Sequence, residues 1–301
     1  MGCLASGWVC FLLGEFTAGR AYLEKALALY DRAHRPSYAE LLSFDARVFL
    51  GLPSSRLLAC LGHLDRALFQ RGAALDEARR LSHPPTLAFA LGAIGWFTGW
   101  LVGLEPGSLL QIADEYLALA TEHRLEFDRM AALLCRGWSL AALGRAGEGI
   151  PLITAGMAGW QQLGYTGERP FSLTALGDAC RRAGQWQVAL AHLAEARRLA
   201  EETESRCFQA ETVRLSGEVL LATGDAAAAE ASYREAIAIA QRQSAKLWEL
   251  RSAMSLARLW RDQGKRSAAR DLLAPVYGWF TEGSGTPVLK EAKALLAELA
   301  A

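Results

Sequence analysis

The residue types that most often carry catalysis are present, but their spacing does not assemble them into a site. Glu201, Glu202 and Glu204 form an acidic cluster, and neighbouring carboxylates can work together in acid and base catalysis. This cluster lies close to an expected helix end, where a solvated run of charge is the simpler interpretation. The histidines are scattered without metal-ligand spacing, at His34, His63, His83, His123 and His192. We therefore predict no catalytic residue and no metal site.

Motifs that bind phosphate or supply a nucleophile are also missing from the sequence. Gly264-Lys265 lacks both the earlier glycine and the following Ser or Thr of a phosphate-binding loop. No G-x-G-x-x-G, H-E-x-x-H or G-x-S-x-G motif occurs. The six cysteines form no C-x-x-C pair and are typical of buried residues in a reducing compartment. The sequence thus favours a protein that is not an enzyme and holds no cofactor.

Composition narrows the class of partner. Of the 301 residues 52% are hydrophobic, and 32 basic residues balance 32 acidic ones. A zero net charge argues against a general nucleic-acid surface. No stretch reaches the roughly 18 uninterrupted apolar residues that a membrane span needs, and the opening segment lacks the basic start of a signal peptide. We expect a cytoplasmic protein with no nucleic-acid or membrane partner.

A glycine recurs along the chain with small or apolar residues at set distances behind it. In one clear copy, Gly184 is followed by Trp186, Ala189 and Ala196, which lie two, five and twelve positions on. The recurring glycines are spaced by 40 or 41 residues, and once by 48: Gly14, Gly62, Gly103, Gly144, Gly184, Gly224 and Gly264. Each is predicted to end one helix in the left-handed conformation, immediately before the next helix begins.

A second glycine lies seven residues before four of these, at Gly7, Gly137, Gly177 and Gly217. It falls inside the first helix of each pair, where the missing side chain would let the second helix approach closely. This pattern resembles the tetratricopeptide repeat, although the period is nearer forty residues than the usual 34 or so. The resemblance implies an all-α fold: a right-handed tetratricopeptide-like solenoid of about seven helical hairpins plus a C-terminal capping helix.

We expect one domain over residues 1–301, with repeats near 1–36, 37–83, 84–124, 125–165, 166–205, 206–245 and 246–283. The capping helix is predicted over 286–300, with Thr286 as N-cap and Pro287 as first helical residue. Its polar residues, Glu291 among them, are expected to shield the open end of the stack. Pro53 falls within the first helix of repeat two and predicts a kink there, or a start near Ser54.

A narrower resemblance covers the whole chain. The run SLARLWRDQGKRSAARDLLAPVYGWFTEGSGTPVLKEAKALLAEL at 255–299 resembles the C-terminal end of large bacterial signalling proteins. In those proteins a class III adenylate/guanylate cyclase domain and an AAA-type ATPase domain precede a tetratricopeptide-like tail, and related tails occur on ATPase-type transcriptional regulators. The segments RGWSLAALGRAGEGI at 136–150 and LSHPPTLAFAL at 81–91 are similar to the middle of such tails. The resemblance implies a regulatory module that binds a protein or its own upstream ATPase and cyclase domains.

The first helix of each hairpin lines the concave side of such a stack, so its exposed positions can be projected from the repeat glycines. The projection gives aromatic residues in the early repeats and arginines in the late ones: Trp8, Phe11, Phe97, Trp100 and Trp138, then Arg181, Arg182, Arg214, Arg251, Arg258 and Arg261. Arginine pairs with carboxylates in bidentate geometry and aromatic residues dominate binding hot spots, so the pattern favours a groove for a peptide with apolar and acidic side chains.

Other interpretations of these residues remain open. An aromatic stripe at helical spacing is often core, and the arginines can simply pair with Asp178, Glu218 and Asp262. Phosphate or nucleotide binding by the arginines is a further possibility. As an alternative to the peptide groove, the curved stack would enclose a small molecule as the sensor domain of an ATPase-type transcriptional regulator.

Overall fold

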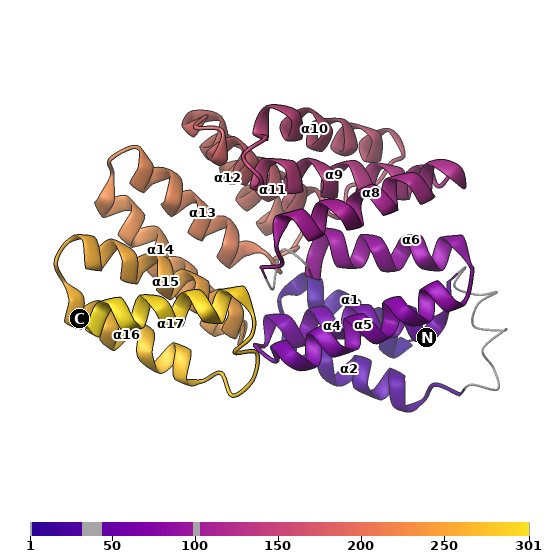
Figure 1. Cartoon of the computed structure of the whole chain (residues 1–301), viewed down its shortest axis with the longest axis horizontal. Coiled ribbons are helices and arrows are strands. Elements are labelled where there is room, and N and C mark those ends of the chain that lie inside the picture. Colours follow the sequence, from indigo (N-terminus) through magenta and orange to yellow (C-terminus); the bar gives the residue numbers. More distant parts are fainter. Residues whose placement is uncertain (1, 32–43, 99–102, 301) are drawn as a thin grey trace.

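The computed structural model describes residues 2–31, 44–98 and 103–300. This part of the chain forms fifteen α-helices, a short π-helical segment and no strand. The helices form seven consecutive hairpins and one terminal helix (Figure 1). The first three hairpins pair α1 (Gly2–Leu13) with α2 (Phe16–Ala28), α4 (Ala46–Cys60) with α5 (Leu64–Arg80), and α6 (Pro84–Gly92) and η2 (Ala93–Thr98) with α8 (Pro106–Glu122). The next two pair α9 (Glu126–Ala142) with α10 (Ala146–Gln162) and α11 (Arg169–Arg182) with α12 (Trp186–Glu202). The last two pair α13 (Gln209–Ala222) with α14 (Ala226–Arg242) and α15 (Lys246–Asp262) with α16 (Arg266–Gly278). The terminal helix is α17 (Pro287–Ala300), and the predicted all-α solenoid is confirmed.

The turns within the hairpins are built as the glycine pattern predicts. All seven recurring glycines have positive φ, from +67° at Gly103 to +93° at Gly224. Several turns between hairpins also use this conformation, but with ordinary residues such as Arg124 at +54° and Glu204 at +57°. A side chain in that region costs about 1 to 2 kcal/mol. The packing of neighbouring hairpins therefore holds these turns against their local preference.

The second glycine, present in four of the repeats, is a point of close helix approach. A Cβ atom added to Gly137 would lie 2.6 Å from the carbonyl oxygen of Gly149 in the facing helix α10. A Cβ added to Gly177 would lie 2.7 Å from Cγ of Leu193, and one added to Gly217 would lie 2.6 Å from the ring of Tyr233. The predicted role of these glycines is confirmed, because real Cβ atoms do not tolerate such distances.

Helix α4 passes through Pro53 without a late start. It begins at Ala46, where the carboxylate of Asp45 accepts hydrogen bonds of 3.1 Å from the N–H groups two and three residues on. The expectation of a start near Ser54 was therefore wrong. Thirteen of the fifteen residues of α4 are buried, so packing from several sides outweighs the cost of a proline in a helix.

The stack curves until its first hairpins contact its last (Figure 1). The carbonyl oxygen of Leu12 accepts hydrogen bonds from the backbone N–H groups of Arg206, at 2.7 Å, and Cys207, at 3.1 Å. Farther along, a carboxylate oxygen of Asp65 accepts a 2.9 Å hydrogen bond from the backbone N–H of Gly283. These contacts join segments more than 190 residues apart in sequence and close the superhelical turn.

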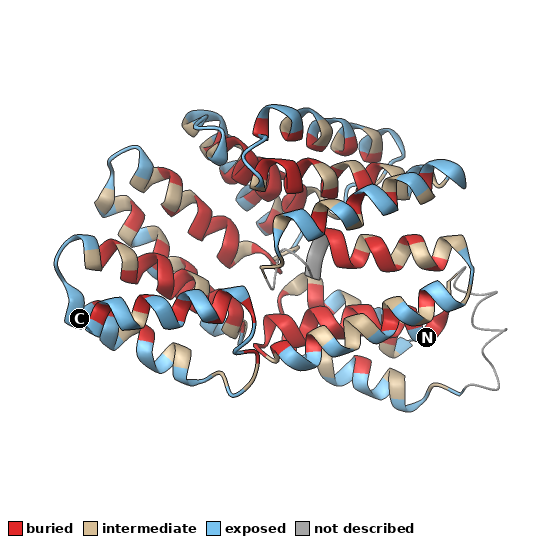
Figure 2. Cartoon of the chain, in the orientation of Figure 1, coloured by how far each residue is buried: buried red, intermediate tan, exposed pale blue. Residues whose placement is uncertain are grey.

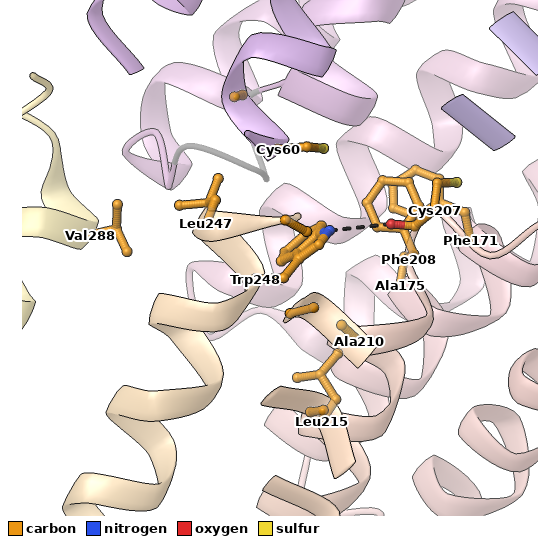
Figure 3. Packing of buried hydrophobic residues seen from close by; sticks show 14 of the residues in the cluster. Cys60, Phe171, Ala175, Cys207, Phe208, Ala210, Leu215, Leu247, Trp248 and Val288 are labelled. Carbon is orange, nitrogen blue, oxygen red and sulfur yellow. Dashed lines mark hydrogen bonds between the residues drawn. The ribbon is translucent and has the colours of Figure 1, made fainter. Parts of the chain in front are cut away.

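Residues on the helix faces that pack against other helices are buried, and residues on the outward faces are exposed (Figure 2). At the closure, Phe171 stacks on Phe208 with ring centroids 4.0 Å apart, and Phe208 meets Trp248 edge to face at 5.6 Å. The indole N–H of Trp248 donates to the carbonyl oxygen of Cys207 at 3.2 Å, and Cys60 of α4 lies beside this cluster (Figure 3). The second hairpin thus packs against the seventh at the closure.

Candidate functional site

One pocket of about 360 Å³ lies among helices α9, α11, α13, α15 and α17 and the turn before α8. We call it the arginine pocket. Its polar and aromatic lining is Trp138, Arg181, Arg182, Arg214, Glu218, Arg251, Arg258 and Glu291, and Met254, Pro287 and Val288 contribute apolar surface. The forty-residue period explains the convergence, since Trp138, Glu218 and Arg258 each lie six residues before a recurring glycine.

Asp178 occupies the same repeat position and contacts three side chains that line the arginine pocket, although it is itself buried. Its buried carboxylate accepts hydrogen bonds from the indole N–H of Trp138 at 3.1 Å, from Arg181 at 2.7 Å and from Arg182 at 2.9 Å. Burial by itself would raise the pKa of this carboxyl, but the charges of Arg182 and Arg181 outweigh it and hold the pKa well below its usual range. Asp178 therefore stays ionised and orients all three side chains.

Glu211 anchors the opposite wall in the same way. Its carboxylate is fully buried, accepts two 2.8 Å hydrogen bonds from Arg214 and lies 2.7 Å from Arg251. Burial acts to raise the pKa of Glu211, and the two guanidinium groups lower it below its ordinary value. Arg214 also donates to Glu218 at 2.9 Å and to the hydroxyl of Ser255 at 3.2 Å. These contacts fix the guanidinium of Arg214 in one orientation.

The terminal helix lines a further side of the pocket. Arg258 on α15 donates to the carboxylate of Glu291 on α17 at 2.6 Å. Glu298 lies two turns farther along α17 and accepts a 2.7 Å hydrogen bond from Arg261 of α15. Arg261 also pairs with Asp262. Of these side chains, Arg258 and Glu291 line the arginine pocket, whereas Arg261 and Glu298 do not. Glu291 thus reaches into the candidate site, beyond the shielding role expected from the sequence.

Six of the eleven residues projected onto a groove line one pocket, and Arg261 does not. Trp138, Arg181, Arg182, Arg214, Arg251 and Arg258 come together in the arginine pocket. Phe11 is instead a core residue, 2% exposed and packed against Phe16, because the inner face of α1 is covered by α2 and α4. Trp8 stacks on Phe11 and lies under the guanidinium of Arg56, 5.4 Å from its ring centroid. Trp100 and the side chain of Phe97 lie outside the described residues.

The pairing of arginines with acidic residues, which the sequence left open, is present. Asp178 and Glu218 have arginine partners inside the pocket, and Asp262 pairs with Arg261 outside it. The projection did not find Glu211, Met254 or Glu291. Glu211 lies one turn before Arg214, a spacing that favours an ion pair on a helix, whereas nothing in the sequence indicates that α17 folds back to the pocket.

The described residues contain no group of three or more His, Cys, Asp and Glu side chains that could hold a metal ion. Across 2–31, 44–98 and 103–300, no helix is both long enough and apolar enough to cross a membrane. The arginine pocket presents five guanidinium groups beside the indole ring of Trp138.

Comparison with solved structures shows which proteins have a similar fold. No protein-family model and no curated protein matches the sequence. Among solved structures, a Rap protein complexed with competence and sporulation factor aligns over 99% of this chain and 86% of its own, with 15% identity and a TM-score of 0.63. NprR in complex with its cognate peptide NprX aligns over 99% and 81%, with 14% identity and a TM-score of 0.59. A tetratricopeptide repeat protein from Parabacteroides merdae ATCC 43184 aligns over 100% and 98%, with 12% identity and a TM-score of 0.51. The chain has a tetratricopeptide-like solenoid fold.

Proposed function

We propose that this tetratricopeptide-like solenoid is a non-catalytic interaction and regulatory module that binds an acidic peptide segment, or such a segment of a partner domain, in the arginine pocket. The observation that carries the proposal is the convergence of five guanidinium groups from three successive repeats on one pocket. Two of the structures with a similar fold are complexes, one with a peptide and one with competence and sporulation factor, which supports a peptide ligand here.

The pocket suits a ligand that carries carboxylates beside apolar side chains. A guanidinium group matches a carboxylate with two parallel hydrogen bonds, and Asp178 and Glu211 already hold four of the five arginines in position. The indole of Trp138, with Met254 and Val288, supplies the surface for an apolar anchor. Because the arginines are oriented before binding, little side-chain order is lost when the ligand arrives.

The test is a titration of a fluorescein-labelled peptide of alternating leucine and glutamate, followed by fluorescence anisotropy. We expect saturable binding that weakens with salt, and none for the peptide with glutamine in place of glutamate. Replacing Arg182 and Arg258 by glutamine should reduce the affinity by at least about tenfold, because each loses a charge-assisted hydrogen bond of about 1.5 to 3 kcal/mol.

The matched control replaces Arg197 and Arg234, whose ion pairs with Glu235 and Glu230 lie outside the pocket. Arg197→Gln with Arg234→Gln should leave the affinity unchanged. The proposal is refuted if the pocket variant and the control bind the peptide equally well.

The size of the pocket supports a second candidate, a small-molecule sensor. About 360 Å³ falls at the small end of the roughly 300 to 1,000 Å³ of typical ligand pockets. Such a ligand would carry the same anionic chemistry in a free small molecule, as in a dicarboxylate. Citrate that displaces the labelled peptide far more effectively than its ionic strength explains would favour the sensor.

We also propose that the module serves a bacterial signalling protein in the cytoplasm and regulates an upstream ATPase or cyclase domain. The resemblance of 255–299 to the tails of such proteins supports this context. An antibody raised to this segment, followed by mass spectrometry of the native protein, tests it. ATPase or cyclase peptides in the captured species are expected, and a species of 32.6 kDa would instead indicate a free-standing adaptor.

A further inference from the structure

Helix α17 brings to the arginine pocket a carboxylate, the same chemical group as the proposed ligand carries. Pro287, Val288 and Glu291 come from the first two turns of α17, and all three line the arginine pocket. The carboxylate of Glu291 accepts a 2.6 Å hydrogen bond from Arg258, which lines the same pocket. An internal acidic side chain therefore already uses one of the five guanidinium groups.

Glu291 differs from the other carboxylates of the site in how it is held. Asp178 and Glu211 are buried, and each contacts two arginines. Glu218 pairs with Arg214 and also accepts a 2.7 Å hydrogen bond from the hydroxyl of Ser255. The side chain of Glu291 is 62% exposed, so it can leave Arg258 without stranding a buried charge.

Glu291 contributes one of the charges that set the charge balance of the pocket. Among the described residues, five guanidinium groups line the pocket and four carboxylates contact them, so these side chains together carry one net positive charge. Moving Glu291 into solvent leaves two. An incoming segment with two acidic side chains would then be neutralised in full.

We propose that Glu291 is an internal competitor that sets the affinity and charge preference of the arginine pocket. A ligand carboxylate takes its place on Arg258, and Glu291 turns outward to solvent. This inference rests on the proposed function. Under this proposal, Glu291 lowers the affinity of the pocket for acidic ligands that carry too little charge to displace it. Segments with paired acidic side chains are therefore preferred.

The test compares three proteins in the leucine–glutamate peptide titration: the full-length chain, Glu291→Gln and Glu298→Gln. Both variants remove one carboxylate from an ion pair between α15 and α17, but Glu298 lies outside the pocket. An exposed ion pair is weak, so we expect Glu291→Gln to tighten binding by about threefold to fivefold and to steepen its salt dependence. Glu298→Gln should bind like the unchanged protein.

Three outcomes overturn the inference. If Glu291→Gln and Glu298→Gln shift the affinity equally, the effect comes from loosening α17 and not from competition. If Glu291→Gln leaves the affinity unchanged while Arg182→Gln with Arg258→Gln still weakens it, the pocket binds the peptide without a competitor and the proposed function alone stands. If none of the proteins binds the peptide, the proposed function fails together with the inference.

Discussion

Replacing the buried carboxylate of Glu211 by a neutral amide should destabilise the fold around the arginine pocket. The side chain is fully buried and lies within 2.8 Å of both Arg214 and Arg251. In Glu211→Gln a neutral amide would face two guanidinium groups that keep their charge. Breaking a buried ion pair from one side costs about 3 to 5 kcal/mol. Because Arg214 retains Glu218, we expect a loss in the free energy of unfolding near the lower end of that range, about 3 kcal/mol.

The same contact predicts a dependence on pH. The pKa of Glu211 is lower in the folded protein than its ordinary value, since Arg214 and Arg251 outweigh the effect of burial. A lowered folded-state pKa means that the carboxylate stabilises the fold above the ordinary pKa of about 4.3 and that this contribution is lost as pH falls below it. The difference in stability between the unchanged protein and Glu211→Gln should therefore be largest near neutral pH and shrink in acid.

Urea unfolding followed by far-UV circular dichroism measures the loss. Because a repeat stack can unfold in stages, amide hydrogen exchange in α13 provides a local value beside the global one. Glu24→Gln is the control, since its exposed pair with Arg20 is worth at most about 0.5 kcal/mol. If the two variants have the same stability at neutral pH, the argument that Glu211 holds the arginines in place is refuted.

Three further predictions concern the stack itself. Gly149→Ala should lower the free energy of unfolding by about 1 to 2 kcal/mol, because overpacking of α10 against α9 exceeds the gain in helix propensity. Gly147→Ala should instead stabilise the same helix, since nothing lies within 4 Å of its added Cβ. Urea midpoints that move in the same direction for both variants would contradict this reasoning. Trp279→Ala should speed amide exchange in the first turn of α5, since this ring packs over the turn at Gly62, and should leave α9 unchanged; equal exchange in α5 would show that Trp279 does not hold the closure. Helix α6, with nine residues that run into the π-helical segment η2, should exchange faster than α9, and uniform protection across the repeats would count against a weak third repeat.

The closure of the superhelical turn changes what the concave side offers to a ligand. Projection from the repeat predicts one long groove, aromatic at its start and basic at its end. In the structure Phe11 is buried within the N-terminal hairpins, and the aromatic cluster around Trp248 packs against α4. The arginine pocket is the part of the projected basic surface that remains hollow.

The sequence by itself determined the architecture of the repeat. The period of about forty residues placed every turn glycine, and the second glycine marked where paired helices approach most closely. Both depend on contacts between helices that are neighbours in the chain, so a local pattern carries the information. The same period put Trp138, Glu218 and Arg258 in register, which is why the basic side of the candidate site could be named before the fold was known.

Only the tertiary structure decided which distant repeats come into contact when the superhelix closes. A small rotation from one hairpin to the next accumulates over seven repeats, and its sum brings Asp65 to Gly283 and the turn at Arg206 to Leu12. Such contacts join residues far apart in sequence through the summed geometry of everything between them, and a repeat pattern describes one step of that sum.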